Sequence, residues 1–270
     1  MEPMLNIAIR AARAAGTIIS RSIDRVDELR IESKSPNDYV SQVDRQAEEA
    51  IIETIKESYP DHSFWGEEYG KQGEGDYQWI IDPLDGTTNF LHGFPQFCTS
   101  IALMHKGVLE QSVVFDPVMN EMFTASKGGG AFLNNKRIRV SKRKSLDGAL
   151  IGTGFPFKEQ ARLELFLDTF RALFPMTAGI RRPGSAALDM AYVASGRLDG
   201  FWEFGLCPWD MAAGVLLIQE AGGAVIDMTG REDYISSGDL ICGNTNVYLE
   251  MHKAFRDVLK KHEYKKPKKF

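Results

Sequence analysis

Five acidic residues occupy positions where predicted strands end or a predicted helix begins. Glu67 and Glu68 follow one short run of strand-forming residues, Asp82 and Asp85 follow the next, and Asp210 opens a helix in the second half of the chain. Side chains at such positions can converge on one point. Carboxylate oxygens are ligands that Mg²⁺ prefers, with water and substrate phosphate completing its octahedron. The spacing therefore predicts a magnesium site among these carboxylates.

The segment Asp85-Gly86-Thr87 adds the features of a phosphate-binding turn. Asp85 is a good helix N-cap, and Gly86 has no side chain to block a phosphate from the amide groups that follow. The Thr87 hydroxyl is placed to orient an attacking water. Hydrolysis of a phosphate monoester needs accelerations of up to about 10²¹-fold, so a two-metal arrangement suits it. The pattern favours phosphate chemistry over acids that only cap helices.

Polar residues in the C-terminal half give less specific signals. Glu203 lies at the end of a predicted strand over residues 198–204, where its carboxylate can accept hydrogen bonds from a polyol. The alternative is an acid on a solvated loop. Arg181 and Arg182 pair across a dimer contact or face the substrate, and the sequence leaves both readings open. The five His residues share no metal-ligand spacing.

The chain resembles the inositol monophosphatase family, and its pattern is closest to the bacterial branch. The resemblance is carried by residues 82–90 (DPLDGTTNF), by residues 209–214 (WDMAAG) and by Gly66-Glu67-Glu68 at the upstream spacing of that family. Three motifs in order make the match specific, and it covers essentially the whole chain. The resemblance implies an α+β fold layered as an αβαβα sandwich, a homodimer, dependence on Mg²⁺ and inhibition by Li⁺.

The resemblance also implies roles for individual residues. The implied Mg²⁺ ligands are Glu67, Asp82, Asp85, Asp210 and the backbone carbonyl of Leu84. The implied catalytic residues are Glu67, Thr87 and Asp85, with Thr87 and Glu67 helping to activate the water. The implied substrate contacts are Asp85, Gly86, Thr87, Ala186, Glu203 and Asp210. Lys34 and Asp44 match a loop that assists a third metal ion. Tyr69 departs from the family, which often has Ser there, and leaves the packing of that loop open.

The implied activity is hydrolysis of small phosphate monoesters, foremost myo-inositol 1-phosphate, to the alcohol and phosphate. Relatives with the same chemistry act on fructose 1,6-bisphosphate or 3′-phosphoadenosine 5′-phosphate, and these substrates stay open. The rival function is a regulatory binding protein, because bacterial relatives are associated with transcription complexes. That function implies contact with RNA polymerase or transcription factors, and it does not exclude catalysis.

Charge and cysteine content limit the other function classes. The net charge is -5, but residues 260–270 carry six Lys and one Glu, so the acidic excess lies in the rest of the chain. Such a body is a poor general nucleic-acid binder. We expect the basic tail over residues 263–270 to be a solvated end. Cys98, Cys207 and Cys242 lack C-x-x-C spacing, which fits a reducing cytoplasm, and no apolar run reaches the roughly 18 residues of a membrane span.

The elements that must position these residues are mixed helices and strands. Helices are predicted over residues 4–22, 43–59, 163–173, 185–195, 209–221 and 246–260, and strands over 64–66, 78–81, 101–104, 108–115, 121–125, 198–204 and 224–226. Residues 34–38 are predicted as a loop and 128–130 as a hairpin turn. The order is not a strict alternation, which favours α+β over a doubly wound fold. We expect one phosphatase domain over residues 1–262, with halves at 1–145 and 146–262.

Overall fold

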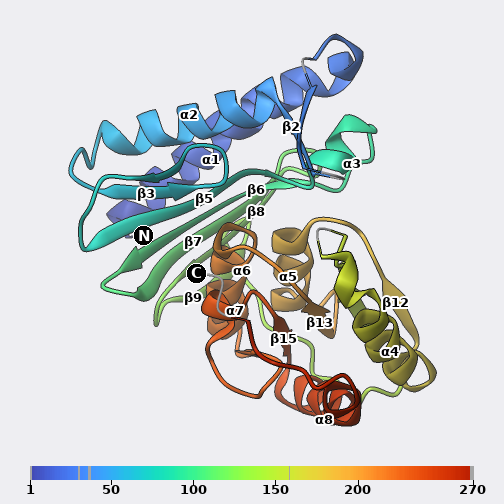
Figure 1. Ribbon diagram of the computed structural model, residues 1–270. Helices are drawn as coiled ribbons and strands as arrows, with labels where there is room; N and C mark the ends of the chain where they lie inside the picture. Colours follow the sequence, from blue (N-terminus) through green and yellow to red (C-terminus); the bar gives the residue numbers. More distant parts are fainter. Residues whose placement is uncertain (1, 30, 36–37, 158, 268–270) are drawn as a thin grey trace.

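The chain folds into alternating layers of helix and sheet, in which two sheets enclose one pair of helices and each sheet carries another pair outside (Figure 1). The structure is a computed structural model that describes residues 2–29, 31–35, 38–157 and 159–267. The side chains of residues 24, 27, 28, 33–35 and 38–40 are not described. The predicted α+β class and the αβαβα layering are confirmed.

The larger sheet has eight strands in the order β10-β9-β8-β7-β6-β5-β3-β4. They are β3 (Ser63–Gly66), β4 (Gly70–Gln72), β5 (Tyr77–Asp85), β6 (Cys98–His105), β7 (Val108–Asp116), β8 (Glu121–Ser126), β9 (Gly130–Leu133) and β10 (Lys136–Arg137). β3 and β5 are parallel, and β6 to β9 form an antiparallel meander. The predicted meander and the hairpin turn at residues 128–130 are confirmed.

Helices α1 (Pro3–Ser22) and α2 (Gln42–Lys56) cover one face of this sheet. The buried face of α1 is rich in alanine, which lets the helix approach the strands closely. At Gly16 an added Cβ would lie 2.4 Å from the Phe115 ring on β7. A capping box formed by Ser41 and Asp44 begins α2, which ends at Lys56 rather than at the predicted residue 59.

The smaller sheet has five strands in the order β12-β11-β13-β15-β14. They are β11 (Leu150–Thr153), β12 (Gly179–Arg181), β13 (Gly200–Glu203), β14 (Ala224–Ile226) and β15 (Leu240–Gly243). Helices α4 (Leu163–Leu173) and α8 (Thr245–Lys261) pack together on its outer side. Helices α5 (Ala186–Ala194) and α6 (Pro208–Glu220) lie between the two sheets.

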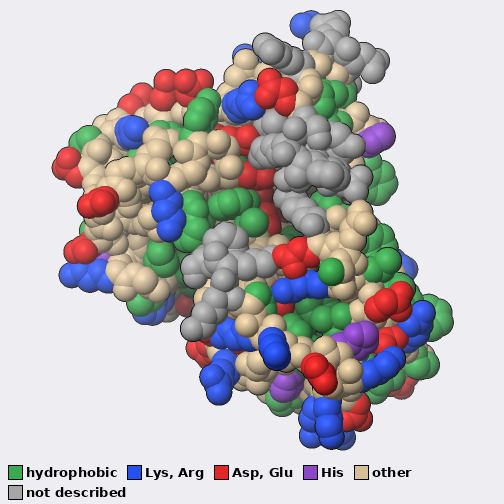
Figure 2. Space-filling model, viewed as in Figure 1, with side chains coloured by type: hydrophobic (Ala, Val, Ile, Leu, Met, Phe, Trp, Pro, Cys, Tyr) green, Lys and Arg blue, Asp and Glu red, His purple; other side chains and the backbone are tan. Residues whose placement is uncertain are grey.

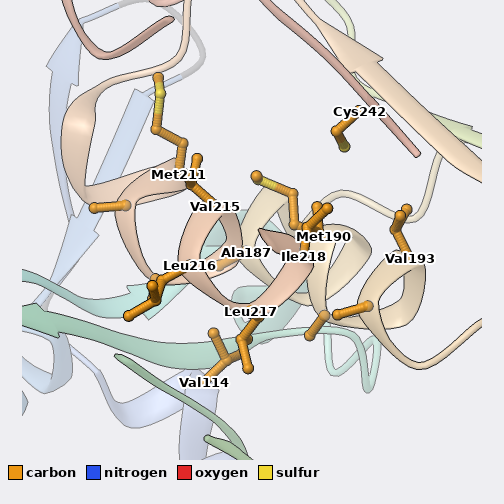
Figure 3. Packing of buried hydrophobic residues seen from close by; sticks show 14 of the residues in the cluster. Val114, Ala187, Met190, Val193, Met211, Val215, Leu216, Leu217, Ile218 and Cys242 are labelled. Atoms are coloured by element: carbon orange, nitrogen blue, oxygen red, sulfur yellow. The ribbon is translucent and has the colours of Figure 1, made fainter. Parts of the chain in front are cut away.

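The central helices are buried on both sides, as their composition requires. Residues 211–218 of α6 are all buried, and a helix that is apolar all round is stable only inside a core. Figure 3 shows Leu217 of α6 against Val114 of the larger sheet. An added Cβ at Gly214 would lie 2.5 Å from Met190, so α5 and α6 are in close contact. This core fixes the starts of both helices relative to the large sheet.

Short helices and a hairpin complete the fold, and the hairpin corrects the sequence analysis. The short helices are η1 (Ile23–Glu28), α3 (Thr87–Leu91), η2 (Gln160–Arg162), η3 (Phe174–Met176) and α7 (Tyr234–Ser237). The predicted loop at residues 34–38 is wrong in part, because β1 (Ile31–Ser35) and β2 (Asp38–Ser41) form an antiparallel hairpin. Residues 36–37 lie outside the described part of the chain. The turn residues predict a change of chain direction, but the strands that flank them are polar and have no clear apolar alternation, so the sequence does not predict the strands.

The described part of the C-terminal tail packs on the body instead of extending into solvent as expected. The Tyr264 hydroxyl donates to Asp239 Oδ2 at 2.7 Å, and Lys266 pairs with Asp227 and Asp233. In Figure 2, Lys and Arg side chains gather at the lower edge, where Figure 1 places α8. None of the described helices is both long and apolar enough to cross a membrane.

Candidate active site

One cleft of about 440 Å³ collects the residues that the sequence nominated as catalytic residues, Mg²⁺ ligands and substrate contacts. Its lining includes Glu67, Asp82, Leu84, Asp85, Gly86, Thr87, Ala186, Glu203 and Asp210. These residues come from the ends of β5 and β13, the turn after β3, and the starts of α3, α5 and α6. The cleft therefore joins both sheets and the central helix layer.

The two aspartates of the main motif lie within the last residues of β5, whereas the sequence placed them after the strand. The pairing of β5 with β6 is irregular between Asp82 and Asp85, so the strand leaves its regular register where the carboxylates are needed. Asp82 Oδ1 accepts the Leu84 amide at 3.0 Å. The Thr99 hydroxyl donates to the Pro83 carbonyl at 3.0 Å and holds the bulge in place.

Asp85 does not cap α3, and the predicted N-cap role is wrong. Gly86, with φ 97°, occupies the N-cap position of this five-residue helix. The Asp85 carboxylate instead turns to the start of α5, where Oδ2 accepts the Ser185 hydroxyl at 2.7 Å and the Ala187 amide at 2.7 Å. Asp85 thereby ties β5 to the central helices. At Gly86, an added Cβ would lie 2.9 Å from the Gln96 carbonyl, so the tight turn requires glycine.

Thr87 is paired with a buried carboxylate on α2. Its hydroxyl lies 2.9 Å from Asp44 Oδ1 and 3.1 Å from the Leu84 carbonyl, and both oxygens are acceptors. The other Asp44 oxygen accepts the Ser41 amide at 2.8 Å and the Ser41 hydroxyl at 2.7 Å. Burial raises the pKa of Asp44, and these hydrogen bonds oppose the rise. With its proton directed at an acceptor, the Thr87 oxygen can itself accept a hydrogen bond from a water.

The resemblance implies a further role for Asp44, together with Lys34, at a third metal ion. The Lys34 side chain lies outside the described residues, so only Asp44 can be placed. The pairing of Asp44 with Thr87 was missed by the sequence analysis. The available signal was an acid on the apolar face of α2, four residues before Glu48 and seven before Ile51, where a core residue is the norm.

Asp210 is positioned by the start of α6. Its Oδ2 accepts the Cys207 amide at 2.6 Å in a capping arrangement, and the Ser100 hydroxyl on β6 donates to the Trp209 carbonyl at 3.1 Å. Trp209 meets Trp65, at the end of β3, edge to face with the ring centroids 6.3 Å apart. This aromatic contact fixes the segment that carries Glu67 relative to the one that carries Asp210.

The site concentrates negative charge in a buried place. Burial, and then the nearby carboxylates of Glu67, Asp85 and Asp210, hold the pKa of Asp82 well above its usual range. Burial raises the pKa of Asp85 to about 6, although hydrogen bonds from Ser185 and Ala187 oppose the rise. Buried like charges are costly unless a counter-charge is present. A cation bound among these carboxylates would supply that charge.

The donor set fits a hard, oxygen-seeking cation. One oxygen each of Asp82, Asp85 and Asp210 is held by a protein donor, which orients the carboxylates toward the cleft. Within the described residues, the side chains as they stand form no group of three His, Cys, Asp or Glu that would hold an ion. Carboxylates that repel one another are expected to draw together only around the cation, and Mg²⁺ takes several ligands from water and substrate. The residues therefore fit Mg²⁺ better than Zn²⁺.

Metal removal is expected to make stability fall as pH rises. Between pH 3.8 and about 6, the raised pKa of Asp85 lets the folded chain bind more protons than the unfolded chain. Deprotonation through this window therefore lowers the site's contribution to the free energy of unfolding. In EDTA, we expect the Tm of the wild type to fall relative to that of Asp85→Asn as the pH rises from 3.8 to about 6. Added Mg²⁺ should remove this fall in the Tm of the wild type relative to that of the variant. Thermal unfolding followed by circular dichroism measures it, and a wild-type Tm that rises relative to the variant contradicts it.

The opposite wall of the cleft carries Glu203. Its carboxylate lies over Gly154, just after β11, where an added Cβ would be 2.0 Å from the carboxyl carbon. Asp189 on α5 is buried beside it, and its Oδ1 has no hydrogen-bond partner in the described part of the chain. Burial, followed by repulsion from Glu203 and Asp85, holds the pKa of Asp189 well above its usual range. Asp189 was not foreseen, because it reads as an ordinary helix position.

Arg182 faces the cleft, which favours one of the two readings that the sequence left open. Its guanidinium lies over the rings of Phe155 at 5.0 Å and Phe157 at 6.0 Å, and it lines the same cleft as Glu203. Tyr69 is also explained, because its side chain is exposed while its amide donates to Glu48 at 3.1 Å. The departure from Ser therefore leaves the interior of the site unaltered.

Comparison with known proteins places this geometry in context. The model of the inositol monophosphatase family matches residues 1–261. Nus factor SuhB of Pseudomonas aeruginosa is 57% identical over 254 residues, which cover 92% of this chain and 94% of the relative. The crystal structure of extragenic suppressor protein suhB from Bartonella henselae has a TM-score of 0.92 at 42% identity, covering 94% and 99% of the two chains. Inositol monophosphatase from Anabaena has a TM-score of 0.85 at 37% identity, covering 96% and 98%. The chain therefore belongs to the inositol monophosphatase family.

Proposed function

We propose that the protein is a Mg²⁺-dependent phosphatase of small phosphate monoesters, foremost myo-inositol 1-phosphate. The observation that carries the proposal is the shared cleft, in which the carboxylates of Glu67, Asp82, Asp85 and Asp210 lie with the Thr87–Asp44 pair, and Glu203 lies on the other wall. Membership of a phosphatase family supports it. With Mg²⁺ bound, the carboxylate wall would attract an anionic phosphate, and Glu203 on the other wall would accept hydrogen bonds from a hydroxylated ring.

In this proposal the residues of the carboxylate wall hold the metal ion, orient the water and contact the phosphate. Glu67, Asp82, Asp85, Asp210 and the Leu84 carbonyl would hold Mg²⁺, which supplies Lewis-acid stabilisation of the phosphate and lowers the pKa of a bound water when present. Thr87, held by Asp44, would accept a hydrogen bond from the attacking water and orient it with Glu67. The Gly86 and Thr87 amides would contact the phosphate. The helix dipole adds little there, because α3 has only five residues.

Release of inorganic phosphate from a panel of monoesters tests the proposal. We expect turnover of myo-inositol 1-phosphate with Mg²⁺, none with EDTA, and inhibition when Li⁺ is added to Mg²⁺. Fructose 1,6-bisphosphate and 3′-phosphoadenosine 5′-phosphate belong in the panel, because they are the competing substrates of this chemistry. Turnover that persists without any divalent metal, or no turnover of any ester, would overturn the proposal.

Substitution of Gly154 tests the polyol wall separately from the phosphate wall. In Gly154→Ala the new Cβ would overlap the Glu203 carboxyl group and displace it. We expect KM for myo-inositol 1-phosphate to rise roughly tenfold, as for one lost hydrogen bond to a charged group, while kcat changes less. Gly75→Ala is the control, because a Cβ there meets only the Asp61 carbonyl at 3.5 Å. An unchanged KM in Gly154→Ala would remove Glu203 from substrate recognition.

We also propose a homodimer that uses the exposed apolar surface beside α4. Phe155, Phe157, Leu163, Phe174 and Met176 are exposed, and a chain of ring contacts links Phe155 through α4 to Phe174. Figure 2 shows hydrophobic side chains along the side where Figure 1 places α4 and β12. Contiguous apolar surface of this kind is typical of interfaces. Sedimentation velocity should show a dimer for the wild type and a monomer for Phe174→Glu, and a monomeric wild type would contradict the proposal.

A second function, as a regulatory partner of transcription complexes, is supported by the name of a relative. The protein from Pseudomonas aeruginosa, at 57% identity, is named Nus factor SuhB. We propose that this chain contacts RNA polymerase or transcription factors in addition to its catalysis. Co-purification with RNA polymerase, compared between the wild type and Asp210→Asn, separates the two functions. Equal recovery of both is expected, and no recovery of either would exclude the contact.

A further inference from the structure

We propose that Glu48 on α2 is a positioning residue that holds the turn carrying Glu67 in its metal-binding geometry. The inference rests on the proposed function, because it treats Glu67 as a Mg²⁺ ligand. Glu48 is fully buried, although glutamate is rarely found in a protein core without a specific partner. It does not line the cleft, and none of the roles assigned to the site includes it.

The Glu48 carboxylate binds two successive amides of the turn between β3 and β4. Oε2 accepts the Glu68 amide at 2.8 Å, and Oε1 accepts the Tyr69 amide at 3.1 Å. On the other side of the turn, the Glu67 amide donates to the Ile81 carbonyl on β5 at 3.1 Å. The residue that points into the cleft is therefore fixed at its own amide and at the two that follow.

The strand before the turn is built to admit this carboxylate. An added Cβ at Gly66 would lie 1.9 Å from Glu48 Oε1 and 2.4 Å from its carboxyl carbon, and the three nearest atoms all belong to this carboxyl group. Gly66 does not have a positive φ, so glycine is not needed for backbone conformation. Space for Glu48 is the remaining reason that the structure shows for glycine here.

Helix α2 thus serves both residues expected to orient the water. Asp44 and Glu48 are four residues apart and lie on one face of the helix, where Asp44 holds Thr87 and Glu48 holds the turn of Glu67. The two contacts set the position of the Thr87 hydroxyl relative to the Glu67 carboxylate. A helix packed firmly on the sheet is a more precise support for a site than a loop.

The test measures Mg²⁺ binding by calorimetry and by the Mg²⁺ concentration that gives half-maximal phosphate release. In Glu48→Gln, one of the two acceptors becomes a donor, so we expect affinity for Mg²⁺ to fall roughly tenfold, with a larger fall in Glu48→Ala. KM for the monoester at saturating Mg²⁺ should change far less. An effect that is only structural would lower the Tm of the metal-free protein without this loss of affinity.

A double-mutant cycle with Gly66 keeps the test decisive even if one variant folds poorly. Gly66→Ala alone should be severe, because the Cβ collides with the carboxylate. In the Glu48→Ala background the space is free, so the same change should cause little further loss of Mg²⁺ affinity. Additive losses in the two backgrounds would show that Gly66 and Glu48 do not act as one unit, and would overturn the proposal.

Asp116→Asn is the matched control. Asp116 is also buried and accepts two successive turn amides, those of Val118 and Met119 at 2.9 Å each, but it lies outside the cleft. It should lose stability without losing Mg²⁺ affinity. Failure of the wild type to bind Mg²⁺ or release phosphate would overturn the proposed function itself. A wild type that binds Mg²⁺, together with an unchanged affinity in Glu48→Gln, would overturn only the role of Glu48.

Discussion

Asp210→Asn is expected to lower kcat/KM for phosphate release by at least roughly 10³-fold, because it removes a charge that electrostatic catalysis requires. Asparagine keeps an oxygen that can accept the Cys207 amide, so the start of α6 should remain capped. The change therefore removes a negative ligand while preserving the local fold. A malachite-green assay for released phosphate at saturating Mg²⁺ measures the loss.

The control for Asp210→Asn is a buried aspartate that caps a turn away from the cleft. Asp227 Oδ1 accepts the amides of Thr229 and Arg231 at 2.8 Å and 2.9 Å, and Asp227 does not line the site. Asp227→Asn should retain activity even if it lowers the Tm. Circular dichroism should show that Asp210→Asn is folded. Phosphate release by Asp210→Asn close to that of the wild type would refute the mechanism.

The sequence predicted best what depends on local pattern. Helices α1, α4, α5 and α6, and the β6–β8 meander, follow from periodicity and turn residues, and their layers follow from the family resemblance. The β1–β2 hairpin could not be predicted in this way, because its strands carry little apolar alternation. The extension of β5 to Asp85 was also missed, because Pro83 reads as the end of a strand when the bulge that accommodates it is unknown.

Within the site, residues could be nominated from motifs, but their partners could not. Asp85 and Ser185 are 100 positions apart, and Thr87 and Asp44 are 43 apart, so no spacing rule links them. The same limit explains the wrong N-cap assignment, since a local rule gave Asp85 to α3 while tertiary packing gives it to α5. The buried acids on α2, Asp44 and Glu48, were the sequence signal for such distant partners. An acid on the apolar face of an amphipathic helix indicates a distant partner.

Thr87→Val is expected to reduce kcat roughly 10²-fold, the lower end of the range for assistance by a positioned proton acceptor. Valine has nearly the shape of threonine but lacks the hydroxyl that connects the site to Asp44. Because the metal ligands and the turn at Gly86 are unchanged, KM should change less than kcat. Thr87→Ser keeps the hydroxyl and should retain most of the activity. Full activity in Thr87→Val together with a loss in Thr87→Ser would point to packing of the methyl group instead, because valine keeps that group and serine does not.

Asp44→Asn then separates the hydroxyl from the group that orients it. Asparagine can present either an oxygen or an amide to Thr87. In a chain that keeps Thr87, Asp44→Asn should therefore lower kcat, because the hydroxyl proton is directed less reliably. It also weakens the cap of α2, at a cost of about 1 kcal/mol in the free energy of unfolding. That cost lowers the Tm in any background. The loss in kcat should appear only when Thr87 is present, since residues that act through one hydrogen bond are not additive. A loss of equal size in Thr87→Val would mean that Asp44 acts on the site by a route other than Thr87.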